Sequence, residues 1–171
     1  MKMREPGMML RSLVIMVGSL SAASTMAADL PKEGSFKGTY TAIGTYKVIK
    51  IGDRSLTTVD EMGLQITNGI ADRMTFHCWG TEETTNGETA AGGYCVAMDP
   101  TGDLIEGKLA KDKHPRGESF KGTLSYVAGT GKFTGISGTC SNEYLGVKHF
   151  RAVVEGTYAM YVTSECNYKL P

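Results

Sequence analysis

The sequence of 171 residues lacks most of the features that would name an activity. It has one tryptophan and three histidines, and no Gly-x-Ser-x-Gly motif marks a nucleophile. His77, His114 and His149 belong to no known metal-binding spacing, and no Cys-x-x-Cys is present. His77 and Cys78 are adjacent, but adjacent side chains of a strand point to opposite faces and are poor joint ligands. We therefore predict no metal site and no cofactor. Whether the protein is an enzyme stays open at this point.

The sequence also lacks a charge excess and a long apolar run. Lys2, Arg4 and Arg11 precede a short apolar stretch at Ser12–Ala23, and Thr25-Met26-Ala27 places small residues at a cleavage site. This layout is typical of a secretory signal peptide. Residues 1–27 are predicted to be the signal and residues 28–171 one domain. That domain has 15 basic and 17 acidic residues, a net charge of −2, so a nucleic-acid partner is not expected. Nor does any segment after the signal predict a membrane span.

No cysteine occurs before Cys78, and all four cysteines follow the predicted cleavage site. An even number in an exported chain predicts disulfides. Together with the signal layout, the cysteines predict a periplasmic or secreted protein.

A long helical pattern is absent as well. Twenty of the 22 glycines fall after residue 27 and interrupt short runs rich in Thr, Tyr, Val, Ile and Phe. Such runs favour strands, and their even spacing favours a sandwich or barrel. We predict an all-β protein, a single antiparallel β-barrel of about eight strands. Among the predicted strands are Ser35–Tyr46, Lys47–Ile51, Lys132–Cys140 and Phe150–Val162.

Asn86-Gly87 gives the strongest local prediction, a hairpin with a type I′ turn. Directly opposed residues of such a hairpin have numbers that sum to 173, as Cys78 and Cys95 do. The alternation of pair types makes 78:95 a non-hydrogen-bonded pair, with Cα atoms roughly 4.5 Å apart. A disulfide between Cys78 and Cys95 is therefore predicted. Cys140 and Cys166 are left as a second pair by elimination, although the other two pairings remain possible.

The same register places a group of aromatic and apolar side chains on one face, where they could line a ligand cavity. A packed core or an oligomer contact is the plainer interpretation, because Trp and Tyr suit interfaces equally well. The ligand-binding residues predicted on this face are His77, Trp79, Tyr94, Val96 and Met98.

Tyr126–Gly138, which reads Tyr-Val-Ala-Gly-Thr-Gly-Lys-Phe-Thr-Gly-Ile-Ser-Gly, resembles the Gly-Thr-Gly-x-Phe hairpin of the allene oxide cyclase and dirigent barrels. Phe36–Tyr40 and Glu155–Tyr158 are similar to other parts of those barrels. The resemblance implies an eight-stranded barrel with a hydrophobic cavity, often trimeric. It also implies chemistry without a cofactor, either cyclisation of a fatty-acid epoxide or guided coupling of phenoxy radicals. No catalytic residue can be matched to this chain. A lipocalin-like barrel is the nearest structural alternative.

Three functions follow as expectations. The first is non-enzymatic binding of a small apolar or aromatic molecule. The second is a cofactor-free cyclase or isomerase, which an enclosed cavity containing His77 or Glu155 would favour. The third is a protein-binding or inhibitory module that uses the hairpin tip at Glu82–Ala91. A homo-oligomer is also possible.

Overall fold

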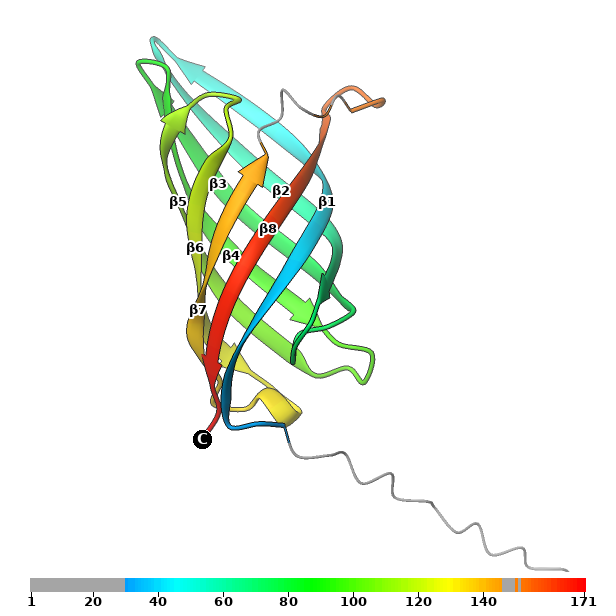
Figure 1. Cartoon of the computed structure of the whole chain (residues 1–171). Coiled ribbons are helices and arrows are strands. Elements are labelled where there is room, and N and C mark those ends of the chain that lie inside the picture. Colours follow the sequence, from blue (N-terminus) through cyan, green and yellow to red (C-terminus); the bar gives the residue numbers. More distant parts are fainter. Residues whose placement is uncertain (1–29, 146–149, 151) are drawn as a thin grey trace, which may run out of the picture.

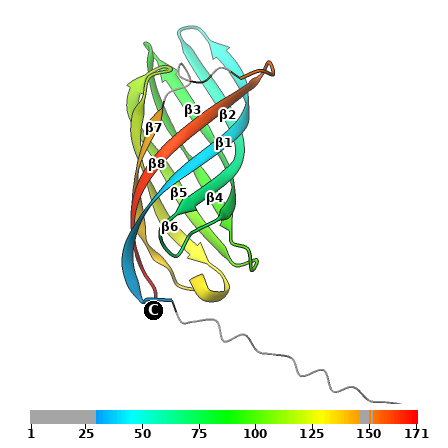
Figure 2. The same cartoon turned by 45° about the vertical axis from the view of Figure 1, so that its right-hand side comes forward.

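The computed structural model describes residues 30–145, 150 and 152–171, and the predicted signal peptide lies outside them. Eight antiparallel strands follow one another around a closed barrel, and β8 pairs with β1 to complete the wall. This confirms the predicted fold class, and the closed wall can be followed in Figure 1 and Figure 2. The strands are β1 Glu33–Ile51, β2 Arg54–Thr67, β3 Met74–Thr85, β4 Glu88–Met98, β5 Leu104–Pro115, β6 Phe120–Gly129, β7 Ser137–Leu145 and β8 Thr157–Lys169.

One end of the barrel is closed by an apolar cluster. A short 3-10 turn, η1 (Gly131–Phe133), follows β6 at the lower end in Figure 1 and inserts Phe133, which is fully buried. Phe133 belongs to the same core cluster as Met74 of β3 and Phe36 of β1. Among the described residues no helix is long and apolar enough to cross a membrane.

An ionic contact holds two loops together at this closed end. Asp99 accepts hydrogen bonds from the backbone N–H of Thr101 and of Asp103, each at 2.9 Å, and from the Thr101 hydroxyl. Its carboxylate also binds Lys132 Nζ, which lies 3.7 Å from the Asp103 carboxylate. Burial disfavours the charged carboxylate, but these donors outweigh it and lower the pKa of Asp99 to about 2.

The predicted β3–β4 hairpin is confirmed in its turn and its register. Asn86 and Gly87 have φ values of 54° and 80°, which a type I′ turn requires. Cys78 lies opposite Cys95, and the residue numbers of every opposed pair in this hairpin sum to 173, as predicted. The disulfide between them is present, with Cα atoms 4.0 Å apart. The second disulfide, Cys140–Cys166, joins β7 to β8.

Three predicted strand boundaries are wrong. Ser35–Tyr46 and Lys47–Ile51 are one continuous strand, β1, because β2 pairs with it along its whole upper part. Lys132–Cys140 begins too early, since Phe133 belongs to η1 and fills the barrel end. Phe150–Val162 is displaced toward the N-terminus, because β8 begins at Thr157 and continues to Lys169.

Candidate functional site

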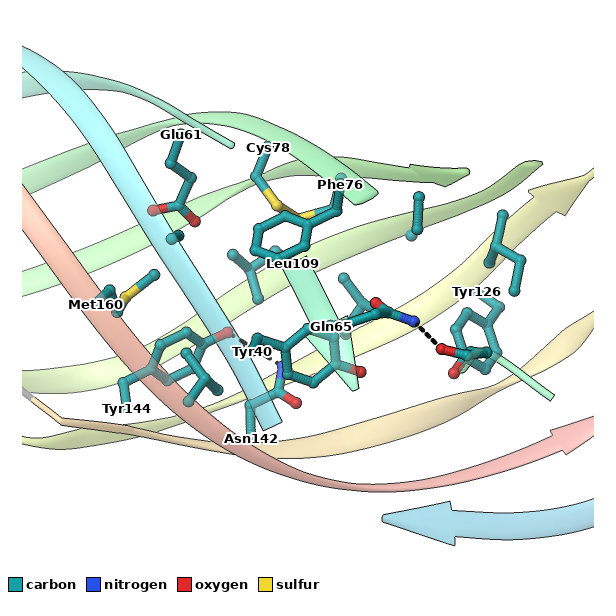
Figure 3. Close-up of a pocket in the computed structure, with 18 residues that line it drawn as sticks. Tyr40, Glu61, Gln65, Phe76, Cys78, Leu109, Tyr126, Asn142, Tyr144 and Met160 are labelled. Atoms are coloured by element: carbon teal, nitrogen blue, oxygen red, sulfur yellow. Dashed lines mark hydrogen bonds between the residues drawn. A yellow bond between two sulfur atoms is a disulfide. The ribbon is translucent and has the colours of Figure 1, made fainter. Parts of the chain in front are cut away.

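An internal cavity of about 70 Å³ lies in the middle of the barrel. A buried water needs roughly 10–15 Å³, so the cavity has room for several waters or one small organic molecule. Alternation along each strand sends every second side chain inward, and the lining comes from all eight strands (Figure 3). The lining residues are Tyr40, Ala42, Glu61, Gln65, Ala71, Phe76, Cys78, Cys95, Ala97, Ile105, Gly107, Leu109, Leu124, Tyr126, Asn142, Tyr144, Met160 and Val162.

The lining is mainly apolar and contains both sulfur-bearing and aromatic groups. Phe76, Leu109 and Met160 surround the cavity in Figure 3, and the Cys78–Cys95 disulfide forms part of its wall. None of the described residues that line it is a lysine, arginine or histidine. An apolar wall with a few placed polar groups is typical of small-molecule sites.

Among the described residues of this wall, Glu61 of β2 is the one that carries a carboxyl group. It is buried, with 4% of its surface exposed, and its Oε2 accepts a hydrogen bond of 2.7 Å from the Tyr158 hydroxyl. Burial raises the pKa of Glu61, and the positive charge of Lys111 and the bond from Tyr158 offset only part of that effect. Glu61 therefore holds a proton more readily than an ordinary glutamate.

Gly44 of β1 makes the contact between Glu61 and Tyr158 possible. In the sheet Gly44 lies between them, opposite Glu61 on one side and Tyr158 on the other. A Cβ at Gly44 would lie 2.6 Å from Cζ of Tyr158. The missing side chain lets the tyrosine ring cross β1 and reach the carboxyl group.

Hydrogen bonds within the protein occupy most of the other polar groups of the wall. The Asn142 amide donates to the Tyr144 hydroxyl at 3.1 Å and accepts from the Ser164 hydroxyl at 2.5 Å. The Gln65 amide donates to the backbone oxygen of Ala71 at 2.5 Å. Two of these bonds are drawn in Figure 3. They fix the amide groups, as buried polar groups require.

Stacked rings and an ion pair pack together beside the cavity, near the connection of β5 to β6, which lies at the upper end in Figure 1. Phe120 stacks between His114 and Tyr144, with ring centroids 4.0 and 4.6 Å away. The Lys111 ammonium lies 5.2 Å from the Phe120 centroid and 3.3 Å from a Glu82 carboxylate oxygen. The side chain of Lys111 is only 6% exposed, so its charge is balanced by Glu82 and by the ring faces of Phe120 and Tyr144.

The five residues predicted to bind a ligand lie on the outer wall of the barrel and do not line this cavity. Their face is hollowed, and His77, Trp79, Val96 and Met98 line the hollow. His77 Nε2 lies 2.9 Å from Asp60 Oδ1, and the Trp79 ring stacks on the Tyr94 ring with centroids 6.4 Å apart. A small-molecule role for this outer face stays a prediction.

The sequence interpretation did not predict Glu61, Tyr40 or Tyr126 as site residues. The sequence did contain information on which face points inward, because the inside of a small barrel leaves room mainly for small side chains. Gly80 and Gly93 oppose each other on the same face as the Cys78–Cys95 pair, and small residues mark the inside of the curve. The larger Trp79 and Tyr94 therefore belong outside.

No family model, curated protein or solved structure matches the chain. The structure by itself shows an eight-stranded antiparallel barrel. Its two disulfides indicate an oxidising, extracytoplasmic setting.

Proposed function

We propose that this protein is a non-enzymatic barrel that binds one small apolar or aromatic molecule. The supporting observation is the cavity inside the closed wall, with its apolar lining and no lysine, arginine or histidine among the described lining residues. Such a wall favours a neutral ligand, since a charged one would lose its hydration without a partner. The volume of about 70 Å³ limits the ligand to a small molecule of at most about one ring.

Titration with ethylbenzene, followed by NMR chemical shifts, tests this proposal. We expect shifts at Ala97 and Leu109 and their loss in Ala97→Leu, which fills the cavity. Ala110→Leu is the matched control, because Ala110 is exposed on the same barrel wall. No binding up to the solubility of ethylbenzene, or unchanged binding in Ala97→Leu, would contradict the proposal.

A cofactor-free cyclase or isomerase of the allene oxide cyclase and dirigent type is the second proposal. The observation that favours it is Glu61, a carboxyl group that faces the cavity and whose pKa is raised by burial. Such a group could protonate a reactive oxygen of the substrate. The two residues whose presence in the cavity would favour an enzyme do not line it, because His77 is on the outer wall and Glu155 is exposed. A fatty-acid epoxide is also much larger than the cavity, so binding without chemistry ranks first. Turnover of a one-ring epoxide that Glu61→Gln abolishes would reverse this order.

The hairpin tip gives less support to the third function, a protein-binding or inhibitory module. β3 and β4 are paired on both outer sides up to the turn, with Thr85 opposite Arg54 and Glu88 opposite Pro115. The segment Glu82–Ala91 is thus part of the barrel wall and does not protrude.

The outer apolar face instead favours contact with a second copy of the chain. Its large apolar side chains each expose on the order of 100 Å², given the full areas of such groups, and together on the order of 700 Å². A standard interface buries roughly 800 Å² per partner. The face spans β1 to β4 and comprises Ile43, Met62, Leu64, Ile66, Trp79, Tyr94 and Met98.

Sedimentation velocity of the mature protein tests self-association. We expect an oligomer that Leu64→Glu dissociates and that Val127→Glu, a change at an exposed apolar residue of β6, leaves intact. A protein that is monomeric at micromolar concentration would refute the proposal that this face contacts a second copy of the chain. Binding to phosphatidylcholine vesicles by such a monomer would assign the face to lipid instead.

A periplasmic or secreted location is also proposed, supported by the two disulfides and the predicted signal at residues 1–27. N-terminal sequencing of protein from expressing cells should begin near Ala28. An intact Met1 would contradict export by cleavage.

A further inference from the structure

Two tyrosine hydroxyls in the cavity wall lie beside sulfur atoms. The Tyr126 oxygen lies 3.1 Å from Cys140 Sγ, and the Tyr40 oxygen lies 4.0 Å from Cys166 Sγ. The two sulfurs are bonded to each other, so the hydroxyls flank one disulfide. Sulfur is a weak acceptor compared with oxygen. Both hydroxyls therefore retain most of their capacity to donate a hydrogen bond.

The surroundings keep these two groups as donors. Burial raises the pKa of Tyr126, and the neighbouring Tyr40 raises it further. Burial also raises the pKa of Tyr40, an effect that a contact with Ser164 partly offsets. Neither phenol ionises in the physiological range, so both present an O–H group to whatever occupies the cavity.

The other polar groups of the wall differ from this pair. Asn142 and Gln65 are bound to Tyr144, Ser164 and a backbone oxygen at 2.5–3.1 Å. Glu61 accepts a bond from Tyr158 at 2.7 Å. Strong bonds thus engage the amides and the carboxyl group, whereas Tyr40 and Tyr126 face sulfur. A ligand that supplies an oxygen acceptor gains most at these two hydroxyls.

We infer that the cavity selects a neutral one-ring molecule that carries a carbonyl oxygen, which accepts a hydrogen bond from Tyr40 or Tyr126. This inference rests on the proposed binding function and names its ligand class. A neutral carbonyl suits the site because the described lining holds three tyrosine hydroxyls and no cationic group, and of the three only the Tyr144 oxygen accepts a bond from an amide of the wall. An anion would meet no positive charge there, and a pure hydrocarbon would offer neither Tyr40 nor Tyr126 an oxygen acceptor.

A pair of probes of nearly equal shape tests the inference. Acetophenone and α-methylstyrene differ in one group, a carbonyl oxygen in place of a methylene. We expect the wild-type protein to bind acetophenone roughly tenfold more tightly, as one net hydrogen bond permits. NMR titration measures both dissociation constants under the same conditions.

Variants then assign the preference to the two hydroxyls. Tyr126→Phe and Tyr40→Phe remove an O–H and keep the ring, so binding of α-methylstyrene should hold while the acetophenone preference falls toward onefold. The double variant should lose it entirely. Tyr94→Phe, on the outer wall, is the matched control and should keep the preference. A thermal melt confirms that each variant folds.

The outcomes separate the inference from the function on which it rests. If neither probe binds, the proposed binding function fails and the inference with it. If both probes bind the wild type equally, the cavity binds ligands and the carbonyl inference alone is overturned. The same holds if the preference survives in the double variant. Because the wild-type comparison needs no substitution, a variant that fails to fold does not remove the test.

Discussion

The two disulfides should contribute unequally to the free energy of unfolding, although both bridge directly opposed residues. Cys78 and Cys95 are 17 residues apart, and loop closure of that length stabilises by about 3 kcal/mol. Cys140 and Cys166 are 26 residues apart, which gives about 3.5 kcal/mol. Loop length alone thus favours the second bridge slightly.

Burial enlarges the difference. Cys140 and Cys166 are 0% and 4% exposed and belong to the main core cluster, whereas Cys95 is only half-buried. Each buried sulfur removed by a change to alanine should cost about 0.8 kcal/mol more, by analogy with a methylene group. We therefore expect a loss of about 5 kcal/mol for Cys140→Ala with Cys166→Ala, and about 4 kcal/mol for Cys78→Ala with Cys95→Ala.

Urea unfolding at pH 7, followed by circular dichroism, measures both double variants against the oxidised wild type. The difference of about 1 kcal/mol means that the Cys140/Cys166 variant should melt roughly 2–4 °C below the Cys78/Cys95 variant. Reduced wild-type protein is the control and should be less stable than either variant. If the Cys78/Cys95 variant proves the less stable of the two, loop length and burial do not govern these bridges.

Three further predictions concern single residues. Because the raised pKa of Glu61 favours its protonated form in the folded protein, the wild type should lose stability relative to Glu61→Gln as pH rises above 4.5. Parallel urea titrations of both proteins at pH 5 and 8 check this. A stability difference between the two proteins that is the same at both pH values would contradict it. Gly44→Ala should displace the Tyr158 ring and destabilise the fold by about 1–3 kcal/mol; an unchanged unfolding midpoint would mean that the ring moves freely. Asp99→Asn should destabilise the fold at pH 7, because the charged Asp99 carboxylate is stabilised by its donors in the folded protein. The difference in stability between the wild type and this variant should shrink as pH falls from 3.8 to about 2, where the carboxylate takes up a proton. A difference that does not depend on pH would exclude the contact with Lys132 as its cause.

The sequence predicts well those parts of the fold that local rules determine. Asn86-Gly87 determines both the turn and the register of its hairpin, and the register in turn pairs Cys78 with Cys95. The β8 boundary was predicted less well, because β8 pairs with β1 at the far end of the chain and no turn residue sets that register.

The candidate site was harder to predict than the fold. Strand alternation separates two faces but does not say which one points inward. On β3 both faces carry apolar groups, with Phe76 on one and Trp79 on the other. Closure of the barrel decides between them, and closure depends on all eight strands. Glu61 was not predicted for the same reason, since a single glutamate in a strand is expected to face solvent unless its face of the strand is known to point inward.

Both bridges lie within hairpin neighbours, β3 with β4 and β7 with β8, and neither crosses the junction of β1 with β8. The cysteines therefore pair in the order in which they occur along the chain, first with second and third with fourth. During oxidative refolding each bridge needs only a local encounter, whereas joining Glu33 to Lys169 needs contact between the two ends of the domain. We expect the native pairs to dominate the earliest oxidised species. Alkylation at timed intervals would detect them before the wall closes, and an early Cys95–Cys140 species would argue against this order. Closure of the barrel is then a separate, later event that adds no covalent bond. The junction of β1 with β8 is held by backbone pairing and side-chain contacts such as the Lys37–Glu165 ion pair, and neither a connecting loop nor a disulfide joins these two neighbouring strands.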